Sequence, residues 1–274
     1  MLHLSVLMEN SAADGYVCEH GLSFLLDFGD TVILFDSGAS DAILNNAMRM
    51  GCDLGAVTHI ALSHGHYDHT GGLGAALRHI AGGKKNGALP PLIAHPDVLL
   101  HRRSPLGHPG GPKDIGMPED SRTELARWPV TYSREPVYIR DDIVFLGEIP
   151  HKDPDMCALI GEAEHDGTYY PDMLLDDTAL AWTTDQGLVI IAGCSHSGIV
   201  NIIAQARAVT GISKIRAVYG GLHCKDMTPE CVKKTRESLT GEGLAELFAC
   251  HCTGGALNDI PQALHLAAGL RHTL

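Results

Sequence analysis

A short stretch crowded with histidine, residues 62–73, constrains this chain more than any other feature of its sequence. It offers four potential metal ligands within six positions: His64, His66, Asp68 and His69. Imidazole and carboxylate groups are the ligands of borderline and hard metal ions. The chain has 17 histidines, so a polar loop with chance histidines is the alternative. Apolar residues before the stretch and a glycine pair after it predict a strand, a ligand loop and a helix entry, and this combination favours a metal site.

The stretch resembles the His-x-His-x-Asp-His signature of the metallo-β-lactamase fold superfamily. The resemblance implies that His64 and His66 bind one metal ion, and that Asp68 and His69 bind a second. It also implies an α/β fold, a four-layer αββα sandwich, and a cofactor of two divalent metal ions, zinc before iron or manganese. It does not specify the reaction, because the superfamily carries hydrolases, oxidoreductases and nucleases on one scaffold.

Length and composition limit the class of protein. The 274 residues allow one large domain or two small ones, and the 45% hydrophobic and 19% charged residues describe an ordinary globular protein. The resemblance implies a single domain over 1–274. The net charge of −13 argues against a nucleic-acid partner, and so against the nuclease branch. Neither a run of about 18 apolar residues nor a signal-peptide pattern occurs, which predicts a cytoplasmic protein without a membrane partner. The eight cysteines are then expected to be thiols or metal ligands.

Strand patterns alternate with helix patterns in both halves of the chain, which is typical of an α/β protein. The expected strands are residues 2–8, 22–28, 32–35, 56–63, 91–94, 137–146 (two short strands), 179–183, 188–192, 215–219 and 244–249. The expected helices run from Ser40 or Asp41 to 50, over 73–80 and 199–209, from Thr228 onward, and over 263–268. Residues 152–173 are polar and are expected to form loops.

Two polar residues directly follow expected strands of the first half. The superfamily commonly has Asp-x-Gly at the position of Asp36, which implies that this residue supports the metal loop from behind. A turn or helix-cap role for Asp36 is the alternative. His95 is expected to be structural, because a single histidine after a strand is more often structural than a metal ligand.

Residues 101–124 differ in composition from the rest of the chain. They are rich in glycine, proline and basic residues, which predicts a loop-rich insertion without a long regular element. Long irregular segments in compact domains are commonly lids or binding loops. Arg102 and Arg103 are therefore candidate substrate-binding residues, since a basic cluster in an acidic protein can receive an anion. A solvated surface loop is the alternative.

Three histidines of the second half each follow an expected strand: His196, His223 and His251. His196 and His251 are followed by turns that contain glycine, as in the metal loop, and we expect them to bind the first and the second metal ion. For each, a hydrogen-bonded core histidine is the alternative. Cys194 is a possible metal-bridging thiolate or a small buried residue. Cys250 and Cys252 would point away from His251 on a strand, and we interpret them as packing residues.

Motifs across nearly the whole chain narrow the resemblance. Gly-Cys-Ser-His-Ser-Gly, Gly-Gly-Leu-His and His-Cys-Thr-Gly are similar to those of the group named 7,8-dihydropterin-6-methyl-4-(β-D-ribofuranosyl)aminobenzene-5′-phosphate synthase. In that group the histidines that match His196 and His251 are the expected ligands. This chain differs at His151, where the group often has arginine after Gly-Glu-Ile-Pro.

The leading functional hypothesis is a dinuclear-metal-dependent hydrolase of a small anionic metabolite, a phosphate ester or a pyrophosphate, or a related synthase. Asp68 would orient the attacking water or accept its proton, and His223 would be an acid or a hydrogen-bond donor to developing negative charge. The alternatives are a di-iron oxidoreductase on the same fold and a non-catalytic module that binds a metal or another ligand. The sequence does not specify the oligomeric state.

Overall fold

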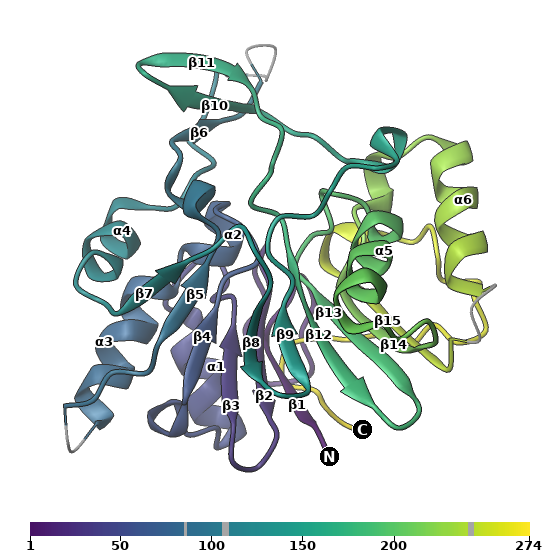
Figure 1. Cartoon of the computed structure of the whole chain (residues 1–274). Coiled ribbons are helices and arrows are strands. Elements are labelled where there is room, and N and C mark those ends of the chain that lie inside the picture. Colours follow the sequence, from purple (N-terminus) through teal and green to yellow (C-terminus); the bar gives the residue numbers. More distant parts are fainter. Residues whose placement is uncertain (85–86, 106–109, 241–243) are drawn as a thin grey trace. The chain divides into compact units, whose positions relative to one another are not determined.

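The structure is a computed structural model that describes residues 1–84, 87–105, 110–240 and 244–274 (Figure 1). It groups the chain into two compact units. Unit 1 comprises Met1–Tyr132, Ile160–Met173 and Ala267–Leu274, and unit 2 comprises Ser133–Leu159 and Leu174–Leu266. Residues 106–109 of the expected insertion lie outside the described residues. The helices of the described chain are all too short or too polar to cross a lipid bilayer.

Unit 1 is built on a seven-stranded sheet in the order β16-β1-β2-β3-β4-β5-β7. Its strands are β1 His3–Met8, β2 Ser23–Asp27, β3 Val32–Phe35, β4 His59–Ala61, β5 Leu92–Ala94, β7 Val130–Tyr132 and β16 Arg271–Thr273. Strands β3, β4, β5 and β7 are parallel, so their carboxyl ends meet at one edge of the sheet. The loops that leave this edge carry Asp36, the metal loop and His95.

Helices cover one face of this sheet. They are α1 Ala42–Met50, α2 Tyr67–Thr70, α3 Leu73–Gly83 and α4 Glu119–Leu125, with short 3₁₀ turns at Leu54–Ala56 and Pro96–Leu99. Leu34, Ile60 and Leu92 of the sheet pack in one buried cluster with Ile43 of α1 and Leu77 of α3. Burial of this apolar cluster stabilises the unit and fixes the strand ends on which the metal loop depends.

A three-stranded sheet in the order β11-β10-β6 also belongs to unit 1 (Figure 1). Its strands are β6 Arg102–Arg103, β10 Glu162–His165 and β11 Thr168–Pro171. The expectation of loops over 152–173 is therefore wrong for residues 162–171. Asp166 and Gly167 connect β10 to β11 with φ of 51° and 79°. Asp-Gly with two positive φ angles is the favoured two-residue hairpin turn, so the sequence did carry a signal for this hairpin.

Unit 2 has a six-stranded sheet in the order β15-β14-β13-β12-β9-β8. Its strands are β8 Val137–Arg140, β9 Ile143–Phe145, β12 Ala179–Thr184, β13 Gly187–Ala192, β14 Ile215–Gly221 and β15 Glu246–Cys250. Strands β13, β14 and β15 are parallel, so the turns after them share one edge. Those turns carry the histidines predicted from the sequence.

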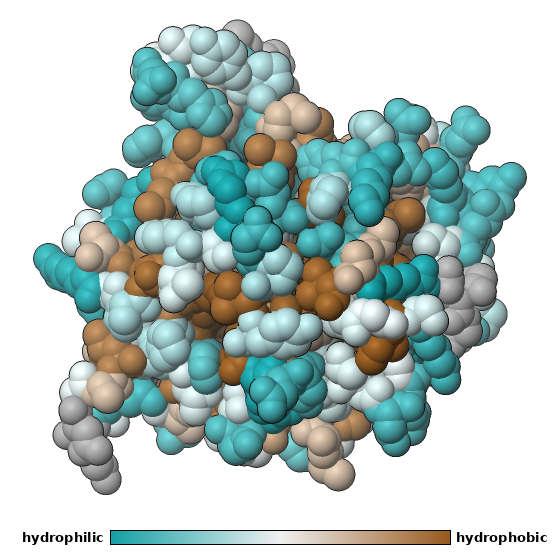
Figure 2. All heavy atoms as spheres, viewed as in Figure 1, coloured by the Kyte–Doolittle hydropathy of each residue, from teal (hydrophilic) through white to brown (hydrophobic). Residues whose placement is uncertain are grey.

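Two helices of unit 2, α5 Ile199–Thr210 and α6 Pro229–Thr240, pack on its sheet, and short 3₁₀ turns occur at Pro154–Met156, Cys224–Asp226 and His251–Thr253. Ile190, Val218 and Leu247 of the sheet share a buried cluster with Ile202 of α5 and Leu239 of α6. The outer side of α6 is hydrophilic (Figure 2). The predicted α/β class and the parallel strands that lead into the histidine turns are confirmed.

The helix expected over residues 263–268 is wrong. Ala263 forms a parallel bridge with Leu247 of the edge strand β15. The Leu264 amide donates to the Leu247 carbonyl, and the Leu247 amide donates to the carbonyl of Gln262. The unpaired edge of β15 thus provides hydrogen-bond partners for this segment, and tertiary context overrides its helix propensity.

Candidate metal centre

The backbone itself marks the turns that carry the candidate ligands. Among the described residues, six that are not glycine have positive φ, and four of them lie within three residues of the ends of parallel strands: Asp36 (57°), Ser195 (58°), His223 (47°) and His251 (54°). Residues other than glycine adopt this left-handed region at a cost of about 1–3 kcal/mol. Such conformations gather where function requires a fixed side-chain direction. Both units therefore concentrate backbone strain at the strand ends singled out by the sequence.

Asp36 organises the metal loop of unit 1. Its side chain is fully buried and accepts hydrogen bonds from the Ser63 amide at 2.7 Å and the Ser63 hydroxyl at 2.6 Å. A third bond joins its Oδ2 to Nδ1 of His69 at 2.7 Å. This carboxylate supports the metal loop from behind, as one of the two readings of the sequence expected. Ser63, the partner that joins Asp36 to the loop, was not singled out from the sequence.

These contacts determine which ring nitrogens carry protons. The carboxylate of Asp36 can only accept, so His69 donates from Nδ1, and in a neutral His69 ring Nε2 is the unprotonated nitrogen. The Ser63 hydroxyl donates its one proton to Asp36 and therefore accepts from Nδ1 of His64, 2.9 Å away. His64 thus also has an unprotonated Nε2. A carboxylate or hydroxyl behind an imidazole is the usual device that orients a histidine toward a metal ion.

The His64 and His66 rings fit a shared cation. Nε2 of His64 lies 3.1 Å from Nδ1 of His66, and the rings meet edge to face with centroids 4.7 Å apart. Two nitrogens bound to one tetrahedral zinc at about 2.0–2.1 Å would be roughly 3.4 Å apart. Burial, and then the guanidinium of Arg102, lower the pKa of His66 to about 3. His66 is therefore neutral at physiological pH, and protons do not compete with a metal ion for it.

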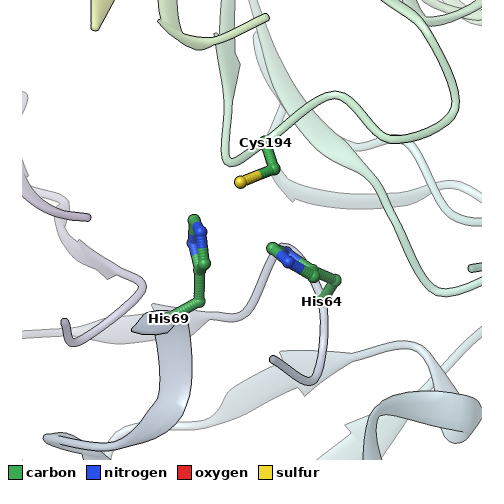
Figure 3. A group of neighbouring side chains, drawn as sticks. All are labelled: His64, His69 and Cys194. Carbon is green, nitrogen blue, oxygen red and sulfur yellow. The ribbon is translucent and has the colours of Figure 1, made fainter. Parts of the chain in front are cut away.

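Asp68 and His69 form the second half of the loop and lie on helix α2. Oδ2 of Asp68 is 3.9 Å from Nε2 of His69 and 3.2 Å from Nε2 of His20. Figure 3 shows the neighbouring rings of His64 and His69, whose centroids are 4.2 Å apart. His20 was not predicted from the sequence, because it lies far from the motif in an irregular segment. His95 accepts a hydrogen bond from the Asp97 amide and caps a 3₁₀ turn, a structural role as expected.

The two arginines predicted to bind substrate already have carboxylate partners. Arg102 is 1% exposed and its Nε donates to Asp172 at 2.6 Å. Arg103 is partly exposed, donates to Glu162 at 2.7 Å, and stacks over the ring of Tyr169 at 3.9 Å. Both pairs join β6 to the segment that contains the β10–β11 hairpin. The substrate-binding role of these arginines stays a prediction.

Arg102 also lies against the metal loop. A side chain added at Gly65 would overlap both the Val98 carbonyl and the Arg102 guanidinium. The residue between the two histidines must therefore be glycine, because the loop passes directly over the buried arginine. Asp172 holds that arginine from a position far along the chain, and nothing in the sequence pattern pointed to it.

The first ligand turn of unit 2 follows β13. Nδ1 of His196 lies 2.7 Å from the Ala158 carbonyl, which can only accept, so His196 carries its proton on Nδ1. Ser195 donates to the Gly221 carbonyl at 2.7 Å, and the Ser197 amide donates to Asp177 at 2.9 Å. The turn is thus held on both sides of His196. Figure 3 shows the side chain of Cys194 at the start of this turn, where it is buried.

The turns after β14 and β15 carry the other two histidines. His223 is buried, and its ring centroid is 4.5 Å from that of His196. The donor atoms of Cys194, His251 and Cys252 all lie within 4.8 Å of one another. The structure therefore groups Cys252 with candidate ligands, whereas the sequence suggested a packing residue. Strand alternation does not apply to Cys252, because the chain leaves the strand at His251, where φ is positive, and the role of Cys252 as a packing residue or a ligand stays a prediction.

Comparisons with known proteins place this geometry in context. Residues 16–156 match the metallo-beta-lactamase superfamily. A relative from Methanocaldococcus jannaschii, named 7,8-dihydropterin-6-methyl-4-(beta-D-ribofuranosyl)-aminobenzene-5'-phosphate synthase, is 32% identical over 247 residues, which cover 86% of this chain and 81% of the relative. An uncharacterised protein from the same organism is 28% identical over 270 residues, or 97% of this chain and 96% of its own. The crystal structure of Tm1679, a metal-dependent hydrolase of the beta-lactamase superfamily, is 26% identical, with a TM-score of 0.84 and coverage of 100% of this chain and 99% of its own.

Proposed function

Since the chain belongs to the metallo-beta-lactamase superfamily, we propose that it is a dinuclear-metal-dependent enzyme that cleaves a phosphate ester or pyrophosphate bond in a small anionic metabolite. The observation that supports this best is the metal loop of unit 1. There, a serine hydroxyl and a buried carboxylate accept hydrogen bonds from Nδ1 of His64 and of His69, which places the proton of each neutral ring on Nδ1. A loop that only had to be stable would not need two neutral imidazoles with unprotonated nitrogens next to each other.

The donor sets of both units fit divalent cations. Unit 1 supplies His64, His66, Asp68 and His69, and unit 2 supplies His196 and His251, with Cys194 as a possible bridging ligand. That His196 serves the same ion as His64 and His66, and His251 the same ion as Asp68 and His69, is kept as predicted from the sequence. When bound, two such ions lower the pKa of a water and neutralise charge on phosphate oxygens.

Residues of the chain would supply the proton transfers. We assign Asp68 to orient the attacking water and to accept its proton, because its carboxylate is buried but paired with a half-exposed His20 that can pass the proton to solvent. We assign His223 to donate a proton or a hydrogen bond to the leaving group. Its ring contacts that of a predicted ligand, His196, so it would lie beside the reacting atoms.

An anionic substrate would be attracted by bound metal ions and not by the net charge of the chain. The chain has a net charge of −13, so an anion would depend on local positive charge, which two divalent ions would supply. The name of the Methanocaldococcus relative describes a 5'-phosphate synthase, and that of the similar solved structure a metal-dependent hydrolase. We therefore include a synthase that releases pyrophosphate beside a hydrolase that releases phosphate. Arg103 is kept as a candidate substrate contact, because its side chain is 29% exposed.

The test is a substrate panel with metal-free and reconstituted protein. Chelator-treated protein would be reloaded with zinc, manganese or ferrous iron and given phosphate monoesters, phosphate diesters and pyrophosphate-bearing compounds. Phosphate and pyrophosphate release would be measured separately, which distinguishes the hydrolase from the synthase. We expect turnover that depends on metal and is lost in His66→Ala, whereas His79→Ala, an exposed histidine on α3, keeps it. Equal turnover by metal-free protein, or none with any metal and substrate class, would contradict the proposal.

A further inference from the structure

Three buried residues of unit 2 gather soft metal donors at one point. Cys194 follows β13, and His251 and Cys252 follow β15, with β14 between these two strands. Their exposed fractions are 2%, 7% and 7%. Their donor atoms, two sulfurs and one imidazole nitrogen, lie within 4.8 Å of one another. All three residues lie in unit 2.

A glycine makes this contact across β14 possible. Gly221 ends β14, and a Cβ atom there would lie 2.5 Å from Sγ of Cys252 and 3.4 Å from Cα of Cys194. Any side chain at this position would overlap with Sγ of Cys252 and displace it. Sγ of Cys252 instead reaches to 3.5 Å from the Cys194 carbonyl, where its thiol donates a weak hydrogen bond. Glycine at position 221 therefore allows Cys252 to approach Cys194.

We propose that Cys194, His251 and Cys252 together bind one zinc-class metal ion, with Cys252 as a thiolate ligand. This deepens the proposed function and rests on it for His251, which is there a metal ligand. Zinc–sulfur bonds of about 2.3 Å and zinc–nitrogen bonds of about 2.0–2.1 Å place tetrahedral donors roughly 3.5–3.8 Å apart. The observed upper limit of 4.8 Å between the donor atoms is about 1 Å wider than that spacing. Binding releases the two thiol protons to solvent, which balances the charge of the divalent ion.

The composition of this donor set determines the choice of metal. Two thiolates and an imidazole favour zinc, cobalt and cadmium over magnesium and manganese, which prefer oxygen ligands. Asp68 and His69, which the proposed function places on the same ion as His251, would raise the number of protein ligands to five, a coordination number that zinc can also adopt. Of the cations that the superfamily resemblance allowed, the site therefore selects zinc over manganese.

Cobalt binding provides the test, because thiolate-to-cobalt charge transfer absorbs in the near ultraviolet in proportion to the number of sulfur ligands. Reduced, metal-free protein would be titrated with cobalt(II) alone. We expect a wild-type band that falls to about half its intensity in Cys252→Ser and in Cys194→Ser. Cys250→Ser is the matched control, since Cys250 is equally buried at the end of β15 but lies outside the group. Its band should be unchanged.

X-ray absorption at the zinc edge of wild-type protein gives an answer that does not depend on whether the variants fold. We expect zinc–sulfur scattering at about 2.3 Å with about one sulfur per zinc on average, because two thiolates would be shared among two zinc ions per chain. A wild-type spectrum without sulfur ligands, or a Cys252→Ser band as strong as that of wild type, would overturn the proposal. Stoichiometric cobalt without a thiolate band, together with metal-dependent turnover, would overturn it while leaving the proposed function intact. A full thiolate band without turnover of any substrate class would support this metal site and overturn the proposed function.

Discussion

Replacement of Asp36 by asparagine should weaken metal binding although Asp36 is not itself a metal ligand. The carboxylate accepts from the Ser63 amide, the Ser63 hydroxyl and Nδ1 of His69. If the asparagine oxygen keeps the amide, its NH₂ group faces the other two donors. His69 must then accept at Nδ1 and carry its proton on Nε2. The Ser63 hydroxyl turns toward His64, which shifts the proton of that ring to Nε2 as well.

The size of the effect follows from these two rings. Loss of an orienting partner behind one metal-bound histidine costs about 10–100-fold in metal affinity. With both rings affected, we expect about 10²-fold weaker binding, or roughly 3 kcal/mol. The metal-free variant should also be less stable by about 2–3 kcal/mol, because three hydrogen bonds to a buried charge become neutral or are lost.

The assay is competition for zinc with a chromophoric chelator, together with thermal unfolding of the metal-free protein. Asp53→Asn is the matched control. Asp53 also accepts a backbone amide in unit 1, that of Gly55 at 2.8 Å, but it is exposed and remote from the ligand loop. Its metal affinity should equal that of wild type. If Asp36→Asn bound zinc as tightly as wild type, the assignment of the His64 and His69 protons to Nδ1 would be refuted.

Three further predictions concern the surroundings of the ligands. Gly65→Ala should lose metal while the sheet stays folded, because its methyl group would overlap the Val98 carbonyl; circular dichroism and metal content check this. Arg102→Leu should lower the free energy of unfolding by about 3–5 kcal/mol, because the buried carboxylate of Asp172 loses its guanidinium partner. Arg103→Leu should lower the free energy of unfolding by less than about 1 kcal/mol but raise KM for an anionic substrate. Burial raises the pKa of Asp177 to about 7, so the free energy of unfolding of the metal-free protein should fall by roughly 4 kcal/mol as the pH rises from about 4 to about 7. Asp177→Asn should abolish that fall, and urea unfolding at a series of pH values measures it.

The features that sequence predicted well are local ones. The metal loop holds its ligands within six positions, and a strand before it and a helix after it confirm the context expected for it. The turns with His196, His223 and His251 were found by the same rule, since each follows a buried parallel strand. Strand periodicity and turn glycines are visible in a window of about ten residues, so a single sequence contains them.

The features that sequence missed depend on contacts between distant segments. Asp172 holds Arg102 across 70 positions, and no periodicity connects the two. The side chain of Cys252 lies near Cys194 because Gly221 of β14 has no side chain between them. Only the order of the strands in the sheet reveals this proximity. The segment over 263–268 has helix-forming residues, but the open edge of β15 pairs with it instead. Strand pairing and edge protection are properties of the whole fold, which local propensity does not report.

Alanine variants of the three histidines that follow strands of unit 2 distinguish a metal ligand from a proton donor. We expect His196→Ala and His251→Ala each to lose metal, because each replaces a predicted ligand. His223→Ala should retain both ions and lose turnover by roughly a hundredfold or more, because it removes a proton donor. Metal loss in His223→Ala, with full occupancy in either of the other two variants, would reverse these assignments.

Metal content tests the central claim most directly. Protein purified without chelator, and protein stripped and reloaded with zinc, would be analysed by inductively coupled plasma mass spectrometry. The account predicts about two ions per chain, and a fall to about one in His66→Ala with the fold retained. Fewer than about one ion per chain after reconstitution with each candidate metal, or equal content in wild type and His66→Ala, would contradict it.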